Sequence, residues 1–240
     1  MIVYKAAAAS EVETRWEDGI WTLHSIEDEA VGIARDLVAN VIKTLRVDDC
    51  MLFFTVGSTF RHEIFPNYKA NRIGKRKPLG LSAIRDRLGD DYYCMSSPRL
   101  EADDLIGIFA TGNPDAIAVS GDKDFATLPC DWFNNLTGER KQHTLEEANY
   151  NHLVQTLTGD ATDGFEGIKG VGAVTAKRHL DKHGATWESV VSLYEKKGLT
   201  EEDALLTARL SYILRHEDYN TETKQIQLWH PRKLSKTKSK

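Results

Sequence analysis

Hydrophobic and polar positions along the chain follow two periods, one typical of helices and one typical of short buried strands. Residues 27–45 carry apolar side chains at every third or fourth position, which predicts an amphipathic helix. Short apolar runs at residues 50–56, 91–96 and 116–120 predict buried strands. Alternating strands and helices are typical of a mostly parallel central sheet with helices on both faces, so we expect an α/β fold.

The remaining segments divide the chain into regions. Residues 1–9 are interpreted as an apolar strand that runs into an alanine-rich turn or helix, and Trp21 to Leu23 as a short strand. Composition shifts beyond Pro129 toward helical patterns, with a last short strand expected at residues 226–229. We therefore expect three regions, listed by their bounds: a sheet-containing domain at 1–145 with a basic segment at 60–88, a helical region at 146–229, and a basic disordered tail at 230–240.

Composition excludes several classes of protein. The chain has 240 residues and 41% hydrophobic content, which is enough for a real core, and no apolar run approaches the roughly 20 residues of a membrane span. Its three cysteines are widely spaced, which favours neither a disulfide framework nor a zinc knuckle. The N-terminus lacks a secretory pattern, so we expect a soluble protein of a reducing cytoplasm, without a membrane partner.

The net charge of −5 hides an uneven distribution. Six basic residues and one acid lie between positions 61 and 77, and residues 232–240 add five basic residues and no acid. A protein that cuts phosphodiesters with metal ions needs this division, because carboxylates hold the cations and basic side chains hold the nucleic-acid backbone.

Two carboxylate clusters frame the strand at residues 116–119. Glu101, Asp103 and Asp104 open a predicted helix, and Asp122 and Asp124 follow the strand. Ligands collect at the carboxyl edge of an open α/β sheet, and crowded carboxylates repel unless cations lie among them. Hard oxygen ligands favour Mg²⁺ or Mn²⁺. The alternative is that the first cluster only favours a helix N-terminus and the second is a solvated loop.

A glycine-rich stretch, GDATDGFEGIKGVG at residues 159–172, precedes a predicted helix. Its glycines permit backbone conformations that side chains block, and its last amides can hold a phosphate at the helix N-terminus. A dinucleotide site is not expected, because no strand precedes the glycines.

Together these motifs resemble the structure-specific 5′-nucleases, which include flap endonucleases and the 5′–3′ nuclease domains of bacterial DNA polymerases. The resemblance rests on Glu-x-Asp-Asp before a helix, Gly-Asp-Lys-Asp-Phe after a strand, Gly-Asp-x-x-Asp-Gly before Gly-Ile-x-Gly-Val-Gly, and PNYKANR at residues 66–72. It covers residues 2–229 and is greatest to the 5′–3′ exonucleases of short-tailed bacteriophages.

The resemblance implies a PIN-like domain, a C-terminal helix–hairpin–helix element, and roles for named residues. Carboxylates around two Mg²⁺ or Mn²⁺ ions would be Glu101, Asp103, Asp104, Asp122, Asp124, Asp160 and Asp163. The basic pair at the scissile phosphate would be Lys69 and Arg72. Contacts to DNA would come from Arg61, Tyr68, Lys75, Arg76, Lys77, Gly167, Lys169, Gly170, Gly172, Thr175 and Lys177, with K⁺ at the glycine hairpin. The expected protein is a monomer acting on 5′ ends, flaps, nicks or RNA–DNA primers in a bacterial cytoplasm.

Two departures from the family pattern predict weakened or lost cleavage. Met1 falls where the first strand of the family still runs, so its terminal Asp is not seen, and Val56 stands where the second strand normally ends in an Asp. The alternative function is a non-cleaving protein of the same fold that holds branched DNA. An RNA-cleaving relative gives no reason for the glycine hairpin.

The aromatic residues are assigned mainly to the core. Phe60, Phe65 and Tyr68 are placed either in the core or stacked on unpaired bases. The tryptophans expected in the core are Trp16, Trp21, Trp187 and Trp229.

Overall fold

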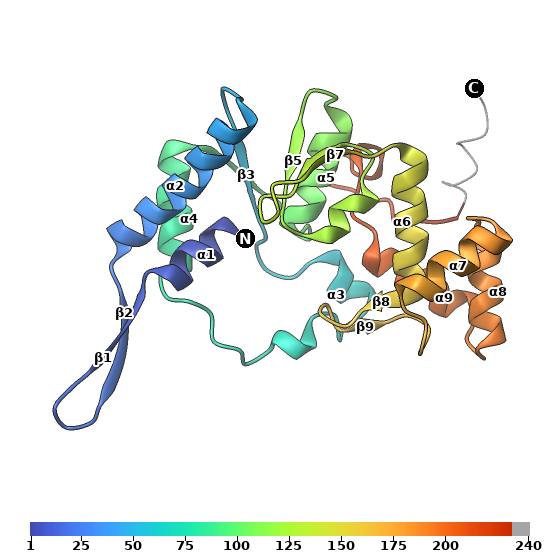
Figure 1. Ribbon diagram of the computed structural model, residues 1–240, viewed down its shortest axis with the longest axis horizontal. Coiled ribbons are helices and arrows are strands. Elements are labelled where there is room, and N and C mark those ends of the chain that lie inside the picture. The colour runs from blue at the N-terminus through green and yellow to red at the C-terminus, as the bar shows by residue number, and fades with distance from the viewer. Residues whose placement is uncertain (232–240) are drawn as a thin grey trace. The chain divides into compact units, whose positions relative to one another are not determined.

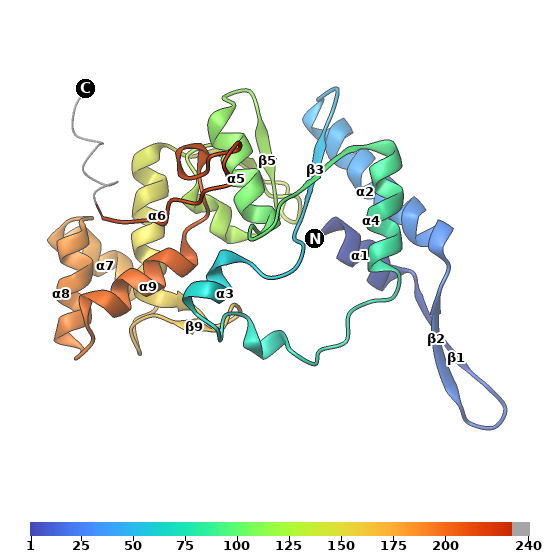
Figure 2. The ribbon, with the colours of Figure 1, turned by 180° about the vertical axis from the view of Figure 1, so that it is seen from behind.

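The computed structural model describes residues 1–231, shown in Figures 1 and 2. Most of the tail predicted at residues 230–240 therefore lies outside the described residues. The chain divides into two compact units: Met1–Phe54 with Gly74–Ser96, and Thr55–Ile73 with Ser97–Lys240. This division does not coincide with the predicted boundary at residue 145, because the residues on both sides of that boundary belong to the second unit. Within the described part of the chain, no helix has the length and apolar character needed to cross a membrane.

The first unit is built on three packed helices and one pair of parallel strands. The helices are α1 (Ile2–Ala9), α2 (Glu27–Leu45) and α4 (Leu81–Asp91), and the strands are β3 (Met51–Phe54) and β4 (Tyr93–Ser96). The predicted strand at the start of the chain is wrong, since these residues form α1. Alanine has the highest helix propensity, and the buried Ala6 and Ala7 let α1 approach its neighbours closely.

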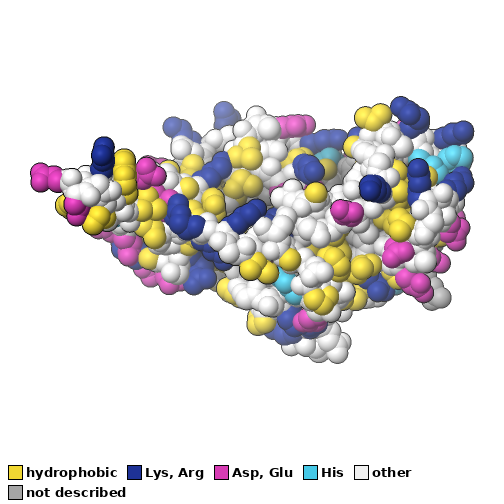
Figure 3. Space-filling view, turned by 90° about the horizontal axis from the view of Figure 1, so that it is seen from below, with side chains coloured by type: hydrophobic (Ala, Val, Ile, Leu, Met, Phe, Trp, Pro, Cys, Tyr) yellow, Lys and Arg dark blue, Asp and Glu magenta, His cyan; other side chains and the backbone are white. Residues whose placement is uncertain are grey.

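A β-hairpin also belongs to the first unit. Strand β1 (Glu11–Arg15) pairs antiparallel with β2 (Trp21–Ser25), and the ribbon extends away from the three helices of its unit (Figure 1). Trp16 is 56% exposed and Trp21 is 62% exposed, so their placement in the core was wrong. At the left end of the space-filling view, hydrophobic side chains lie among acidic and basic ones (Figure 3).

The sheet of the second unit has three strands. Strand β5 (Ile117–Val119) runs parallel to β6 (Asp131–Phe133), which pairs antiparallel with β7 (Arg140–Gln142). Helix α5 (Ala102–Gly112) packs beside it, and Ala110, Ala118 and Phe125 belong to the buried cluster between them. The α/β class and the parallel pairing are confirmed. The described strands, however, form four sheets of two or three strands in place of one central sheet.

Helices make up most of the rest of the second unit. They are α3 (Phe60–Ile64), α6 (Leu145–Thr158), α7 (Ala173–His183), α8 (Trp187–Lys196) and α9 (Glu201–Ser211), with the 3₁₀ turns η1 (Ala70–Arg72), η2 (Lys123–Thr127) and η3 (His216–Asp218). The two-residue strands β8 (Gly159–Asp160) and β9 (Phe165–Glu166) form a tight pair. Trp187 and Trp229 are buried, as predicted. The strand predicted around Trp229 is not formed, since only Ile226 makes an isolated bridge, to Tyr219.

Candidate functional site

A buried ion pair lies at the centre of the second unit, at the start of α5. Arg61 donates to both carboxylate oxygens of Asp104, at 2.7 and 2.9 Å, and to the backbone carbonyls of Leu210 and Tyr212. Asp104 is 0% exposed and also accepts from the backbone nitrogens of Glu101 and Leu214. Burial opposes the charge of Arg61, but the adjacent Asp104 carboxylate outweighs it and raises the pKa of Arg61.

This geometry corrects two predictions. Arg61 was expected to contact DNA, yet it is 3% exposed and donates its hydrogen bonds inward, to Asp104 and to two backbone carbonyls. Asp104 was expected to bind metal. Each of its two carboxylate oxygens, however, already accepts two hydrogen bonds, and no solvent reaches the side chain. An ionised carboxylate offers about four acceptor positions. Asp104 therefore holds α5 in place and has no free position for a cation.

The predicted basic pair contacts two of the predicted metal ligands. Lys69 Nζ lies 2.5 Å from Glu101 Oε1 and 3.4 Å from Asp163 Oδ2. Arg72 Nη2 lies 2.5 Å from Asp163 Oδ1. Burial raises the pKa of Glu101, but the charges of Arg61 and Lys69 outweigh it, so the pKa of Glu101 is below its ordinary value. Lys69 and Glu101 are about 30 positions apart in the sequence, and Arg72 and Asp163 are about 90 apart. The fold thus brings opposite charges from distant segments together.

Backbone contacts fix the basic segment against the loop that carries Asp163. The Lys69 amide donates to the Asp163 carbonyl at 2.7 Å, and the Asn71 side chain donates to the carbonyls of Ala161 and Thr162. Lys69 has φ 56°, in the left-handed region, where non-glycine residues are uncommon and cost about 1–3 kcal/mol. Such strain persists only where the surroundings enforce it, which is typical of functional positions.

Tyr68 links the same two carboxylates. Its hydroxyl lies 3.0 Å from Glu101 Oε2 and 2.9 Å from Asp163 Oδ2, and burial followed by the two carboxylate charges raises its pKa. Tyr68 is 3% exposed and Phe60 is 2% exposed. Base stacking by Tyr68, and its assignment as a DNA contact, are therefore wrong, and both rings belong to the core.

The other predicted metal ligands crowd together nearby. Burial, followed by the charges of Glu101 and Asp122, raises the pKa of Asp103 to about 7. Burial and the charge of Asp122 raise the pKa of Asp124 to about 6, with Asp160 contributing. The charge of Lys69 on Asp103 and that of Lys123 on Asp124 offset these shifts only in part. The mutual repulsion of these carboxylates is the condition that a divalent cation relieves.

The donor chemistry fits a hard divalent cation, but no cage is preformed. Among residues 1–231, no three Asp, Glu, His or Cys side chains converge closely enough to hold an ion as they stand. Gln155, which the sequence analysis missed, hydrogen-bonds the Asp124 side chain, and its own Oε1 is buried without a hydrogen-bond partner. No sequence signal marked Gln155, because it lies within the ordinary pattern of helix α6.

Val56 follows strand β3 by two residues. The neighbouring Thr55 accepts a hydrogen bond from the Ala102 amide at 2.9 Å, which attaches residue 55 to the first turn of α5. Position 56 is therefore joined through Thr55 to the helix that carries Asp103. The apolar Val56 provides no ligand there.

The glycines of the hairpin at residues 167–172 have different structural roles. A Cβ at Gly167 would collide with the backbone of Gly159, so Gly167 is needed for close packing, whereas Gly170 adopts φ 81°. Its neighbours Lys169 and Lys177 are exposed. The other predicted DNA contacts on this element, Gly172 and Thr175, are exposed as well, and so are Lys75, Arg76 and Lys77 of the first unit. Arg76 is paired with Glu11 of its own unit at 2.6 Å.

Known proteins resemble this chain over most of its length. Residues 3–155 match the family described as the 5′-3′ exonuclease, N-terminal resolvase-like domain. The exonuclease of Escherichia phage T7 is 33% identical over 276 aligned residues, which cover 96% of this chain and 91% of that protein. The exodeoxyribonuclease of Enterobacteria phage T3 is 34% identical over 279 aligned residues, covering 96% and 90%.

Solved structures support the same fold. The T5 5′-exonuclease with bound zinc ions matches with a TM-score of 0.61 and 16% identity, over 75% of this chain and 80% of that one. The T5 flap endonuclease in a pseudo-enzyme–product complex with DNA and metal ions also matches with a TM-score of 0.61 and 16% identity, over 75% and 81%.

Proposed function

The chain belongs to the 5′–3′ exonuclease family, and on this premise we propose that it is a metal-dependent nuclease of duplex or branched DNA. Its substrates would be 5′ ends, flaps and nicks, with RNA–DNA primers as a related class. We place it as a monomer in the DNA metabolism of a phage-infected bacterial cell. The observation that carries the proposal is the contact of Lys69 and Arg72 with Glu101 and Asp163.

The cation-binding residues follow from the charge distribution. The negative charges of Asp103, Asp122, Asp124 and Asp160 act on one another and are only partly offset by Lys69 and Lys123. These four carboxylates would therefore hold Mg²⁺ or Mn²⁺, and Gln155 would orient Asp124. Glu101 and Asp163 would complete the set for a second ion. Bound divalent ions lower the pKa of water and offset charge on a phosphate.

Lys69 and Arg72 would serve the phosphate directly. In the free protein their charges are balanced by Glu101 and Asp163, and we infer that a phosphate of the DNA takes over as their partner. The Lys69 backbone is held by its hydrogen bond to the Asp163 carbonyl, and its flexible side chain would let the ammonium move from the carboxylates to the phosphate. Two cations aimed at the scissile phosphate stabilise the charge that develops during hydrolysis.

The duplex would be held by the exposed part of the hairpin. Lys169, Thr175 and Lys177 surround the N-terminus of α7, where backbone amides favour phosphate. A K⁺ ion among the carbonyls of residues 167–172 is part of this proposal. Lys75, Arg76 and Lys77 would contribute further phosphate contacts.

Val56 favours the second candidate function, a non-cleaving protein that holds branched DNA. A labelled 5′-flap DNA, incubated with the chain in Mg²⁺ and in EDTA, separates the two functions. Product that forms only with Mg²⁺ supports the nuclease, whereas a shifted but intact band supports the binder. Val56→Asp should raise Mg²⁺-dependent cleavage by orders of magnitude, and Val56→Asn, which adds a polar side chain without charge, is the matched control.

A further inference from the structure

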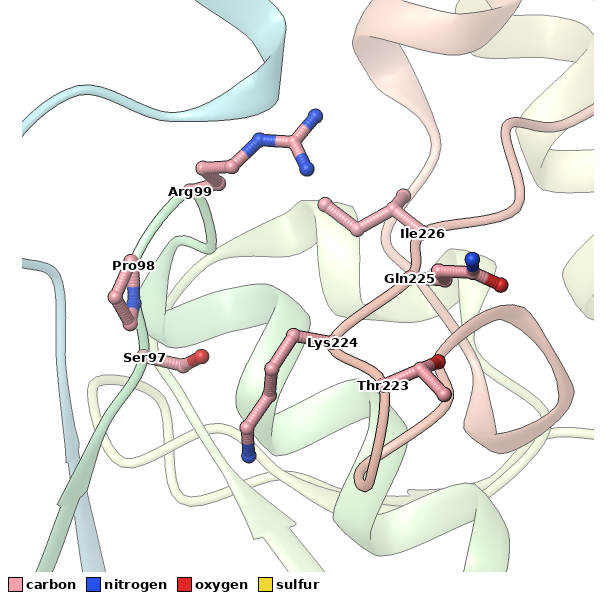
Figure 4. A pocket seen from close by; sticks show the side chains of 7 residues that line it. All are labelled: Ser97, Pro98, Arg99, Thr223, Lys224, Gln225 and Ile226. Atoms are coloured by element: carbon pink, nitrogen blue, oxygen red, sulfur yellow. The ribbon is translucent and has the colours of Figure 1, made fainter.

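One pocket of the second unit contains none of the predicted metal ligands. It lies between the segment that leads into α5 and the segment that follows η3, and the side chains of Arg99 and Lys224 point away from each other there (Figure 4). Arg99 donates to both carboxylate oxygens of Glu63, and the Ser97 hydroxyl lies 3.1 Å from that of Tyr219. These side chains bond to their own surroundings, whereas side chains of helix α6 reach toward the candidate site.

Two amide side chains of α6 face the turn that carries Asp122 and Asp124. Asn151 and Gln155 are four positions apart, which places them on the same face of the helix. The Asn151 amide nitrogen donates to the Ala126 carbonyl at 2.9 Å, and the Gln155 side chain hydrogen-bonds that of Asp124. One face of α6 therefore holds both the backbone and a carboxylate of η2.

The turn η2 passes a displacement of its backbone on to the carboxylates. The Asp124 amide donates to the Asp122 carboxylate at 2.9 Å, and the Thr127 hydroxyl donates to the Asp124 carbonyl at 2.7 Å. Ala126 lies between these bonded residues and follows Asp124 by two positions. A shift of the Ala126 carbonyl would therefore move the backbone that carries Asp124.

We propose that Asn151 is a positioning residue for the candidate metal site, because it holds η2 where the Asp122 and Asp124 carboxylates can meet one divalent cation. The proposal rests on the function proposed above and adds a residue to it. No cage is preformed in the described part of the chain, so the carboxylates have to turn toward an ion, and a fixed backbone keeps them within reach of it. Replacing a residue that orients metal ligands typically changes the metal affinity about 10–100-fold.

Tyr150 offers a matched control on the same helix. It directly precedes Asn151, and both side chains are partly exposed. The Tyr150 hydroxyl also bonds to another element, since it donates to the Asp181 carboxylate of α7 at 2.7 Å. Tyr150→Phe removes this bond and keeps the ring, so it changes the attachment of α6 to α7 and leaves η2 in place.

The test measures Mn²⁺ affinity without DNA, from the electron paramagnetic resonance signal of free Mn²⁺. Asn151→Leu keeps the approximate volume of the side chain and removes the donor to Ala126. It should weaken Mn²⁺ binding about tenfold, whereas Tyr150→Phe should leave it unchanged. Neither change should alter the affinity for a labelled 5′-flap DNA in EDTA. Urea titration of both variants separates a loss of stability, which either can show, from the loss of Mn²⁺ affinity.

Equal Mn²⁺ affinities of Asn151→Leu and the unaltered chain would overturn the proposal, and so would an equal loss in Tyr150→Phe. If Asn151→Leu does not fold, Asn151→Ala takes its place with the same expected result. Asp124→Asn should weaken Mn²⁺ binding, which assigns the measured ions to this site. Failure of the unaltered chain to bind Mn²⁺ would instead refute the proposed function, so the two failures are distinguishable.

Discussion

Replacing Glu101 by Gln should strengthen DNA binding when no divalent ion is present. Lys69 is held by Glu101 at 2.5 Å and must leave it to reach a phosphate of the DNA. Gln keeps the shape of the side chain and can still accept the hydrogen bond that caps α5. It removes the charge that holds Lys69, so less free energy is spent in freeing the ammonium.

The expected size of the effect follows from this contact. A hydrogen bond between charged groups contributes about 1.5–3 kcal/mol and a neutral one about 0.5–1.5 kcal/mol. Exchanging the first for the second makes the release of Lys69 easier by about 1–1.5 kcal/mol. The affinity for DNA should therefore rise about tenfold.

Asp122→Asn is the matched control, because it removes one negative charge from the same region, whereas Lys69 pairs with Glu101 and Asp163. A unit charge about 10 Å from a phosphate is worth about 0.4 kcal/mol in water, and less after screening by salt. The control should therefore tighten binding about twofold at most.

The assay is fluorescence anisotropy with a labelled 5′-flap DNA in EDTA, and circular dichroism checks that each variant is folded. Equal affinities of Glu101→Gln and Asp122→Asn would refute the reasoning. In that case Lys69 would not compete between its carboxylate and the DNA.

Three further predictions concern stability and the duplex contact. Arg61→Met should lower the free energy of unfolding by about 3–5 kcal/mol in urea titration, because Asp104 stays buried and unpaired; a loss below about 1 kcal/mol would contradict this. His143 is buried with neither ring nitrogen hydrogen-bonded, and burial lowers its pKa. The neutral His143 ring therefore contributes fully to stability above the ordinary histidine pKa, and this contribution is lost as the pH falls below that value. Between about pH 8 and about pH 5.5, the His143→Phe chain should lose less stability than the unaltered chain. Equal losses would contradict this. Lys169→Ala should lower the salt slope of DNA binding by about one, whereas Lys196→Ala should not change it; equal slopes would remove Lys169 from the duplex contact.

Local patterns predicted the elements better than they predicted the partners of single residues. The periodic residues Glu27–Leu45 form α2 with the expected bounds. The apolar start of the chain was misread because residues 2–4 are β-branched or aromatic and favour a strand, whereas the four alanines at residues 6–9 favour the helix that forms. Trp16 and Trp21 were misplaced because their hairpin leaves both side chains exposed, which no local pattern reports.

The sequence predicted which charged residues meet in the candidate site, but it did not predict the partner of each one. The sequence showed that acids and bases would meet, and Lys69 does contact Glu101 and Asp163. It did not show that Arg61 would turn inward to Asp104, because that pairing joins residues 43 positions apart. A basic residue that binds a phosphate and one that balances a buried acid look identical in a sequence.

The most direct test of the account is the single-turnover cleavage rate of a labelled 5′-flap DNA in Mg²⁺, measured for the Val56→Asp chain with and without Asp124→Asn. We expect the Asp124→Asn change to lower the rate by at least about 100-fold while DNA affinity is retained, and EDTA to abolish product in both. Equal rates for the two chains, or product that forms in EDTA, would contradict the claim that these carboxylates hold the ions that cut DNA.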